Sequence, residues 1–404
     1  MRRFLISKAI GGDKLWTPRG DIRYGQAHYS WMLIARLYEQ ALAALSYPTQ
    51  EMVRPEIYQS PLAGATLHLS LSDIHLAIKP IEELRRLKFT RNFFVCGWEF
   101  PEFSTTPFES NPFFNQIQTL GGADAVLCWS DFTRTNLERH GLTNAFTLPP
   151  PLAGASDMED GVPAVDCLTL DTHCAPGSEA PVALPTFLAA HQHSRRFVSV
   201  LNPWDRRKEL PRMMSEFVQA ARETPDICLV VKLVIDNQGT TVLNVNEILR
   251  AVYGLELKAD NVAFVGAALS DIDLRRVLKQ AHYYLCTSSA EGLNLPLIEA
   301  MIQGVVPLAP WNSAMGTYLD ASCSIGMETE RRDHQGRTHA LHDHLSTSIF
   351  PPRSGAVQSA VTHAARLTQR EDQQLRRQAR TRARERFGLA TFSDRLERIL
   401  QWRA

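Results

Sequence analysis

The chain has 404 residues, which is long for one ordinary hydrophobic core, so the first expectation is two domains. Its 43 basic and 43 acidic residues balance to zero net charge, which does not indicate a nucleic-acid-binding protein. No apolar run approaches the ~20 residues that a membrane-spanning helix needs, and the N-terminus lacks a signal-peptide pattern. We therefore expect a cytoplasmic protein, with peripheral contact at the inner membrane left open.

The seven cysteines are an odd number and show no CxxC spacing. Cys167 and Cys174 fall in a polar stretch, where a disulfide or a metal role is an open alternative. The cysteines that lie in apolar, strand-like runs are predicted to be buried free thiols of a reducing compartment. They are Cys96, Cys128, Cys228 and Cys286.

Short apolar runs alternate with longer amphipathic ones, which is typical of parallel α/β sheets. A helix is predicted over 25–46. Ser130 can cap the helix that follows it, because its hydroxyl oxygen can accept from a free helical N–H, and Gly141 provides a stop. The strands predicted in the first half are 3–10, 65–71, 92–98, 124–129 and 145–148.

Residues 152–194 are rich in Ala, Pro, Gly, Asp and Ser, and we interpret them as an irregular insertion near the domain boundary. A second series of alternating strands and helices starts at residue 196 and predicts a second doubly wound domain. The end of the chain, 369–402, is predicted to be helical and is rich in arginine. The expected domains are 1–195 and 196–380, followed by a C-terminal helix, 381–404.

The segment 284–318 carries the most chemical information. A strand ends at Ser288, a tight loop follows, and a helix begins near Leu295, so free backbone N–H groups and a helix dipole lie at the carboxyl end of a strand. Such an arrangement is a natural anion site. Glu291 lies in the loop and Glu299 lies in the helix, so both carboxylates can face one cleft.

The sequence EGLNLPLIEAMIQGVVP resembles the E-x7-E signature of retaining glycosyltransferase family 4 and its GT-B relatives, which typically read E-G-F-G-L-P-x-x-E-A-M-A-x-G-x-P-V. The resemblance implies that Glu291 lies near the donor sugar and diphosphate and that Glu299 binds the ribose hydroxyls. It also implies that the N–H groups around Asn294 and Leu295 contact the donor sugar or its phosphate. Asn294 stands where the family has glycine. The alternative is a well-capped core helix with one surface acid.

The loop NPWDRRKEL, 202–210, follows the first strand of the second domain. The family often has R-K-G or R-K-N here, and the resemblance implies that Lys208, with its neighbour Arg207, binds the donor diphosphate. Many members place another arginine six residues before this lysine, where this chain has Asn202. Lys232 is the candidate replacement, because an ammonium in an apolar strand must be paired or reach a cleft. A charge cluster at a helix start is the alternative.

A leaving nucleotide diphosphate gains negative charge in the transition state, so a metal ion or fixed cations must stabilise it. Metal-using transferases usually show an Asp-x-Asp motif. Asp271 and Asp273 have this spacing, but they open a helix, and we interpret them as helix capping. We therefore expect no metal and no cofactor, with Lys208 and its neighbours acting on the leaving group.

In the first half, the strand NFFVCGW ends at Trp98-Glu99 and is followed by proline, and this resembles one branch of the family. The resemblance implies that Glu99 faces the sugar or the acceptor, and the alternative is a strand-end acid in solvent. Glu99 and Glu291 are then the two acids expected to support an oxocarbenium-like state.

Two further clusters carry open alternatives. Four histidines fall in 334–344, where a metal site is an alternative to a connecting loop. The basic run RRQARTRARERF, 376–387, is a candidate for peripheral contact with anionic lipid or glycan, and a solvated helix face is the alternative.

The resemblance as a whole implies an α/β protein of the GT-B fold, with two Rossmann-like domains facing a central cleft. It implies an N-terminal acceptor domain, a C-terminal donor domain and a metal-independent, retaining glycosyltransferase. The partners would be a nucleotide sugar, such as a GDP- or UDP-sugar, and a glycan or lipid-linked acceptor of polysaccharide or lipopolysaccharide assembly. An oxidoreductase is disfavoured because no GxGxxG follows a strand. A catalytically inactive GT-B scaffold or glycan-binding subunit is the alternative.

Overall fold

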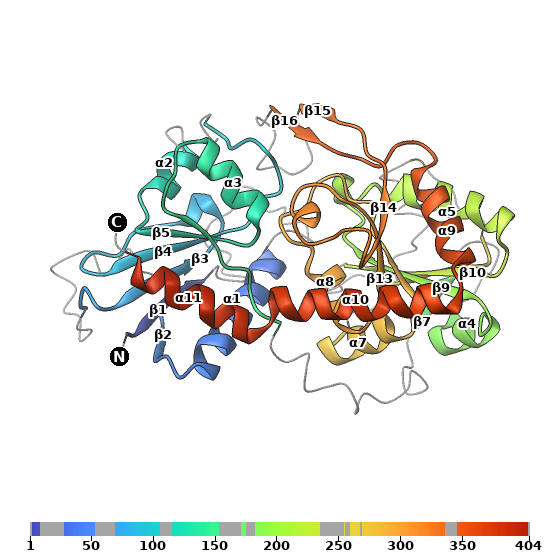
Figure 1. The fold of residues 1–404 in the computed structure, drawn as a ribbon, viewed down its shortest axis with the longest axis horizontal. Helices are drawn as coiled ribbons and strands as arrows, with labels where there is room; N and C mark the ends of the chain where they lie inside the picture. Colours follow the sequence, from blue (N-terminus) through green and yellow to red (C-terminus); the bar gives the residue numbers. More distant parts are fainter. Residues whose placement is uncertain are drawn as a thin grey trace. The chain divides into compact units, whose positions relative to one another are not determined.

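The computed structural model describes residues 2–8, 28–52, 69–105, 115–152, 171–174, 182–234, 254, 259–266, 269–335 and 346–402 (Figure 1). The chain divides into two compact units, each of which contains its own sheet. Unit 1 comprises 1–153, 333–348 and 386–404. Unit 2 comprises 154–332 and 349–385.

The sheet of unit 1 has six parallel strands in the order β2-β1-β3-β4-β5-β6. The central strands are buried almost along their whole length, as expected for a parallel sheet that is covered on both faces. The order reverses direction between β1 and β3, which defines a doubly wound sheet. The strands are β1 Phe4–Lys8, β2 Thr49–Glu51, β3 Ile74–Ile78, β4 Arg91–Cys96, β5 Ala125–Cys128 and β6 Ala145–Thr147.

Helices cover both faces of this sheet. Tyr38 of α1 packs edge-on against Phe392 of α11 with ring centroids 5.6 Å apart, so these two helices share one face. Figure 1 shows α2 and α3 on the other face. The helical elements are α1 His28–Ala44, the 3-10 helix η3 Ile81–Glu83, α2 Gln116–Gly121, α3 Asp131–Arg139 and α11 Leu389–Gln401.

The second unit has an eight-stranded sheet in the order β14-β13-β12-β9-β10-β11-β7-β8. Its six parallel strands follow the chain order 6-5-4-1-2-3, the Rossmann arrangement, which reverses between β9 and β12. The first two strands pair antiparallel at the edge beyond β11. The strands are β7 Asp171–Cys174, β8 Val182–Ala183, β9 Arg195–Leu201, β10 Ile227–Leu233, β11 Val262–Val265, β12 Tyr283–Leu285, β13 Val306–Pro310 and β14 Ile325–Met327.

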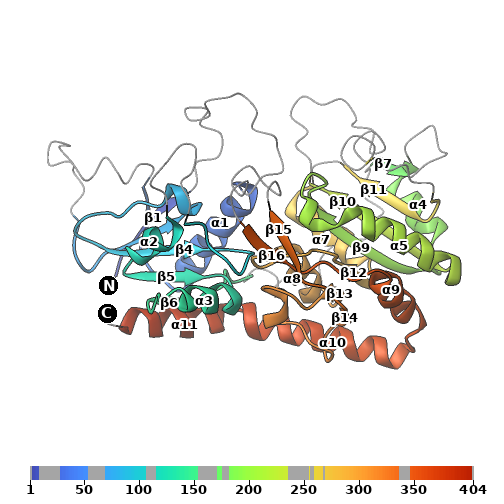
Figure 2. The same cartoon turned by 90° about the horizontal axis from the view of Figure 1, so that it is seen from above.

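Alternate strand residues of unit 2 form a buried core with α5 and α9, while α7 and α8 lie over the other face (Figures 1 and 2). The two core helices are joined by Glu216, whose carboxylate accepts from the N–H groups of Gly355, Val357 and Gln358 at 2.9–3.2 Å. The helical elements are α4 Leu184–Ala190, η6 Arg206–Lys208, α5 Leu210–Glu223, α7 Asp271–Lys279, α8 Leu295–Ile302, η7 Met315–Thr317, α9 Ala356–Arg366 and α10 Gln369–Phe387.

A two-stranded hairpin, β15 Arg332–Gln335 and β16 Ser346–Ile349, completes the described elements. Most of it belongs to unit 1. Glu102 holds it there, because one carboxylate oxygen accepts from the Thr347 hydroxyl at 2.6 Å and from the Ser348 N–H at 3.0 Å.

The prediction of two doubly wound α/β domains is confirmed, and so are the four buried thiols. The cap at Ser130 is confirmed too, because its hydroxyl oxygen accepts from the N–H of Thr133 at 3.2 Å. The strand predicted at 65–71 is wrong for its described part, since 69–71 lie outside any strand and β3 follows instead. The sequence of β3 is IHLAI. Its buried His75 interrupts the apolar run by which a buried strand is predicted.

The irregular insertion predicted at 152–194 is wrong where the structure describes it. There β7 and β8 join the second sheet and α4 follows, so this stretch lies in unit 2 rather than with the residues before it. Leu184, Phe187 and Leu188 are buried along α4, at helical spacing that the surrounding Ala and Pro residues obscured. The second series of strands and helices also predicts a helix at 244–254, NVNEILRAVYG, which lies almost wholly outside the described residues.

Candidate functional site

The candidate site lies in unit 2, at the carboxyl ends of β9 and β12. These are the neighbouring strands between which the strand order reverses. In open α/β sheets, a ligand binds in the crevice at such a point because the loops from the two strands diverge there. The loop after β9 carries Lys208, and the loop after β12 carries Glu291. Both side chains line a small cavity, together with residues of the two strands.

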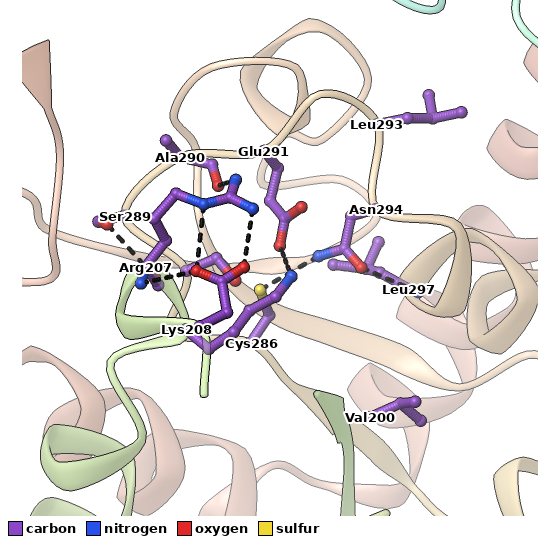
Figure 3. Close-up of polar contacts among 12 residues, drawn as sticks. Val200, Arg207, Lys208, Cys286, Ser289, Ala290, Glu291, Leu293, Asn294 and Leu297 are labelled. Atoms are coloured by element: carbon purple, nitrogen blue, oxygen red, sulfur yellow. Dashed lines mark hydrogen bonds and ion pairs between the residues drawn. The ribbon is translucent and has the colours of Figure 1, made fainter. Parts of the chain in front are cut away.

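Lys208 and Glu291 form an ion pair across this point, with 2.5 Å between Nζ and a carboxylate oxygen (Figure 3). Only 19% of the lysine side chain and 8% of the glutamate side chain are exposed. Burial lowers the pKa of Lys208, but the charges of Glu291 and Asp205 outweigh it, so the pKa lies above its ordinary value. Lys208 is therefore held as a cation.

Arg207 has a different set of contacts from Lys208. Its guanidinium makes two bonds to Asp205, at 3.2 and 2.7 Å, and a third to the carbonyl of Ala290 at 3.2 Å. Burial raises the pKa of Asp205, but the nearby charges of Arg207 and Lys208 lower it by more. The pKa therefore lies below its ordinary value. Arg207 thus fastens the β9 loop to the β12 loop, and Asp205 balances its charge.

Backbone bonds reinforce this connection. The Ser289 N–H donates to the Arg207 carbonyl at 2.8 Å, and the Thr287 hydroxyl donates to the Lys208 carbonyl at 2.6 Å. A third loop, after β13, joins from the other side, where the Ser313 hydroxyl accepts from the Glu291 N–H at 2.8 Å. The carboxylate is consequently positioned by three loops.

Backbone strain is concentrated in these loops. Five non-glycine residues of the described chain have positive φ, and three of them stand here: Glu209 (51°), Asn294 (70°) and Ser313 (43°). Left-handed conformations are unfavourable for side chains with a Cβ and tend to collect at functional sites.

Asn294 explains the departure from the glycine of the resembled motif. Asparagine is among the few residues that adopt the left-handed region readily, and its Oδ1 caps α8 by accepting from the Leu297 N–H at 3.4 Å. Pro296 has no N–H, and the Ile298 N–H donates to the Asn294 carbonyl. The N–H of Leu295 is then the first-turn donor that these bonds do not engage.

Glu299 lies half-buried on α8, about one turn further along. The hydroxyl of Tyr284 bonds the N–H and the carbonyl of Val200 at 3.3 and 3.2 Å. Burial is the main cause that raises the pKa of Tyr284 well above its ordinary value. The nearby Cys286 thiol and the charges of Glu291 and Glu299 act in the same direction. The Tyr284 phenol, on β12, thus reaches across to β9 and is influenced by the charges of both acids.

Lys232 is the next to last residue of β10 and is in register with Val200, which lines the cavity. Its side chain is 6% exposed, and its ammonium donates to the carbonyl of Leu233. Burial lowers the pKa of Lys232 to about 8. The structure thus places this lysine at the same sheet edge as the cavity.

Glu99 lies in unit 1, half-buried in the loop after β4. Two contacts of Trp98 pack this loop. Its ring stacks on Phe103 with centroids 5.5 Å apart, and its indole N–H donates to the Glu102 carbonyl at 2.7 Å. Gly97 is required by packing, because a Cβ there would lie 1.9 Å from the ring of Trp129. These contacts pack the residues before and after Glu99.

Asp273 lies at the start of a helix, which agrees with its interpretation as part of a helix cap. It follows the N-cap Ser270 of α7, whose hydroxyl oxygen accepts from the Asp273 N–H at 3.1 Å, and it pairs with Arg276 at 2.8 Å. Within the described ranges, no group of three His, Cys, Asp or Glu residues is arranged to hold a metal ion. Most of the histidine-rich stretch, from residue 336 to 345, lies outside those ranges.

Sequence reasoning missed the residues that position the site. Asp205, Ser313 and Asn312 were given no role, although Asn312 donates to the carbonyls of Ser288 and Phe350 at 3.1 and 2.7 Å. Asn and Ser directly after a strand are common loop residues, so position in the sequence alone did not separate them from others.

The structure resembles solved proteins of the GT-B fold, and the chain has that fold. Trehalose-6-phosphate synthase OtsA superposes with a TM-score of 0.62 at 11% identity over 99% of both chains. HepE of Anabaena, in complex with UDP-glucose, gives 0.58 at 12% identity over 98% of this chain and 99% of HepE. No protein-family profile and no curated protein sequence matches the chain.

A third similar structure is that of a longer protein. A point mutant of TarM of S. aureus, in complex with fondaparinux, α-GlcNAc-glycerol and UDP, superposes with a TM-score of 0.52 at 12% identity. The match covers 82% of this chain but 56% of TarM, so the chain spans little more than half of that protein.

Proposed function

We propose that the protein is a retaining, metal-independent glycosyltransferase that moves a sugar from a nucleotide diphosphate sugar to a glycan or lipid-linked acceptor. The observation that carries the proposal is the Lys208–Glu291 pair at the crevice between β9 and β12. A cation and an acid held together at this point suit a substrate with an anionic leaving group beside a sugar. Similar folds hold UDP and sugars, which supports the same ligand class here.

In this proposal unit 2 binds the donor. Lys208 stabilises the charge that the departing diphosphate gains, and Arg207 keeps its loop in place. Glu291 supports the positive charge that develops on the sugar, and Glu299 binds the ribose. The N–H of Leu295 contacts the sugar or phosphate beside Asn294. Retention follows from the resemblance of the Glu291–Glu299 segment to retaining enzymes.

Unit 1 serves the acceptor in this proposal, with Glu99 as the acid nearest to it. The packing of the loop around Glu99 supports this role, because an acid that acts on a sugar must be positioned for it. A hexosyl transfer in polysaccharide or lipopolysaccharide assembly, in the cytoplasm, is the activity that we infer.

A basic stripe on α10 supports peripheral contact with an anionic membrane. Exposed arginines recur there at spacings of three, four and seven residues, so they share one side of the helix. The exposed acids of the helix lie on another side. The stripe consists of Arg370, Arg377, Arg380 and Arg384. No described helix is long and apolar enough to cross a membrane. Sedimentation with anionic and neutral vesicles tests this contact, which Arg377→Glu should weaken.

The main test is binding and slow hydrolysis across a panel of UDP- and GDP-sugars, with and without EDTA. We expect one donor to bind and turn over equally well in both conditions, and the released sugar to keep its anomeric configuration by NMR. Glu291→Ala should abolish turnover and leave the fold intact. Full activity of this variant would remove Glu291 from the mechanism.

The second candidate is an inactive GT-B scaffold or glycan-binding subunit, and Asn202 is the observation that favours it. The position holds no cation, and the Asn202 side chain instead accepts from the Trp204 N–H at 2.9 Å. Failure of every donor to bind would favour this candidate.

A further inference from the structure

The charges around the crevice cancel. Asp205 and Arg207 form one ion pair at 2.7 Å, and Lys208 and Glu291 form the other at 2.5 Å. A diphosphate carries negative charge on both of its phosphorus centres. These four residues alone would therefore receive it with no net positive charge, and Glu299 adds a further negative one nearby.

Backbone donors compensate only part of this deficit, because the N–H of Leu295 is a neutral donor. In the first turn of α8, the N–H of Leu297 is used by the Asn294 side chain and Pro296 has none. In the loop after β9, the Asn202 side chain is an acceptor, since its oxygen bonds the Trp204 N–H. A cation from a neighbouring strand would give the crevice the net positive charge that suits a diphosphate.

Lys232 is placed to supply it. Leu229, Val231 and Leu233 of β10 face the core under α5 and α9. Because strand side chains alternate, Lys232 faces the other side of the sheet, the side of α8. It is in register with Val200 of β9, which lines the cavity, and neighbouring strands lie about 4.8 Å apart.

The surroundings of Lys232 also fit an anion. The ammonium is buried, and the contact that the described residues give it is the carbonyl of Leu233. The burial that depresses its pKa is not offset by a carboxylate among those residues. A buried ammonium in this state is costly unless an anion arrives to pair with it.

We propose that Lys232 binds the diphosphate of the nucleotide sugar and supplies the positive charge that position 202 lacks. The inference rests on the proposed function, because it assumes a nucleoside diphosphate at this crevice. It adds a phosphate ligand from the second strand of the domain, apart from the Lys208 loop.

The test compares Lys232→Met with the wild type by calorimetric titration of UDP, GDP, uridine and guanosine. We expect the variant to bind the preferred nucleoside diphosphate at least tenfold more weakly and the matching nucleoside unchanged. Lys279→Met, which removes an exposed lysine of α7, is the matched control and should bind as the wild type does.

Thermal unfolding without ligand provides the second readout. Removing an uncompensated buried charge should raise the melting temperature of Lys232→Met, whereas a lysine with a structural role would lower it. Equal affinity for the diphosphate, or a destabilised or unfolded variant, overturns the inference and leaves the proposed function standing. A wild type that binds neither UDP nor GDP contradicts the proposed function, and the inference falls with it.

Discussion

The ammonium of Lys208 and the carboxylate of Glu291 meet at 2.5 Å although the residues are 83 positions apart in the chain. They meet because β9 and β12 are neighbours in the sheet while being the first and fourth parallel strands in sequence. The reversal of strand order thus brings the two side chains together. Each of them is mostly buried, so each depends on the other to balance its charge.

Removing one member of this pair should cost more than removing both. Lys208→Met or Glu291→Gln leaves a mostly buried, unpaired partner, whereas the double variant leaves none. We expect a coupling energy of about 1–3 kcal/mol in the free energy of unfolding, measured by urea denaturation of the four proteins. Strictly additive losses would mean that the pair does not stabilise the fold.

Asn294 should tolerate glycine better than alanine. Alanine loses the cap and retains the cost of a positive φ, which together should destabilise the protein by about 1–2 kcal/mol. Glycine loses the cap but relieves the backbone, so we expect a loss of only a few tenths of a kcal/mol. Urea denaturation of both variants measures the difference, and the reverse ranking would rule out backbone conformation as the reason for Asn294.

Glu216→Ala should destabilise unit 2 by about 2–3 kcal/mol, because three backbone N–H groups at the start of α9 lose a charged acceptor. Glu223→Ala, on the same helix but exposed, is the control and should change stability by less than about 0.5 kcal/mol. Thermal unfolding of the two variants compares them. Equal effects would show that the bonds from Glu216 add nothing.

Gly97→Ala should be strongly destabilising, by roughly 3 kcal/mol, because the new methyl group would overlap the Trp129 ring. Replacing the ring in Gly97→Ala/Trp129→Leu should recover part of the loss relative to Trp129→Leu alone. Chemical denaturation of the three variants tests this. If the smaller residue at 129 brings no recovery, the clash is not the cause.

The stability difference between the wild type and Lys232→Met should depend on pH. The pKa of Lys232 is about 8 in the folded protein, below the ordinary lysine value of 10.5 that applies to the unfolded chain. Between these values the unfolded chain binds a proton that the folded chain does not, so the wild type gains stability relative to the variant as pH rises. Buried thiols such as Cys96 act in the opposite direction, but they are present in both proteins and cancel in the difference. A constant difference from pH 7 to 10 would contradict the shifted pKa.

The fold could be predicted because the alternation of apolar strands and amphipathic helices is strong where α5, α8 and β9 lie. The prediction failed at β3. There the buried His75 bonds Ser7 at 2.8 Å and Asn92 at 3.0 Å, so a polar side chain finds its partners inside the sheet. These partners come from two other strands and cannot be read from local sequence.

The site could be predicted in part. Glu291 and Lys208 were found by resemblance, and the structure brings them together. The binding of the donor diphosphate by Arg207 stays a prediction. The bonds that its guanidinium makes to Asp205 and to the Ala290 carbonyl could not be inferred, because only the folded loops bring these groups together. Charge balance is a property of the assembled site rather than of any motif.

Unit 1 combines residues 1–153 with the distant segments 333–348 and 386–404. Arg2, beside β1, donates to the Leu400 carbonyl of α11 at 2.8 Å, and Tyr38 packs on Phe392 of the same helix. At ~5–20 residues per second, a ribosome needs roughly 10–50 s to pass from residue 153 to residue 386. For that interval α11 is missing from one face of the sheet of unit 1, so the apolar side chains that pack against it, such as Tyr38, stay uncovered during synthesis.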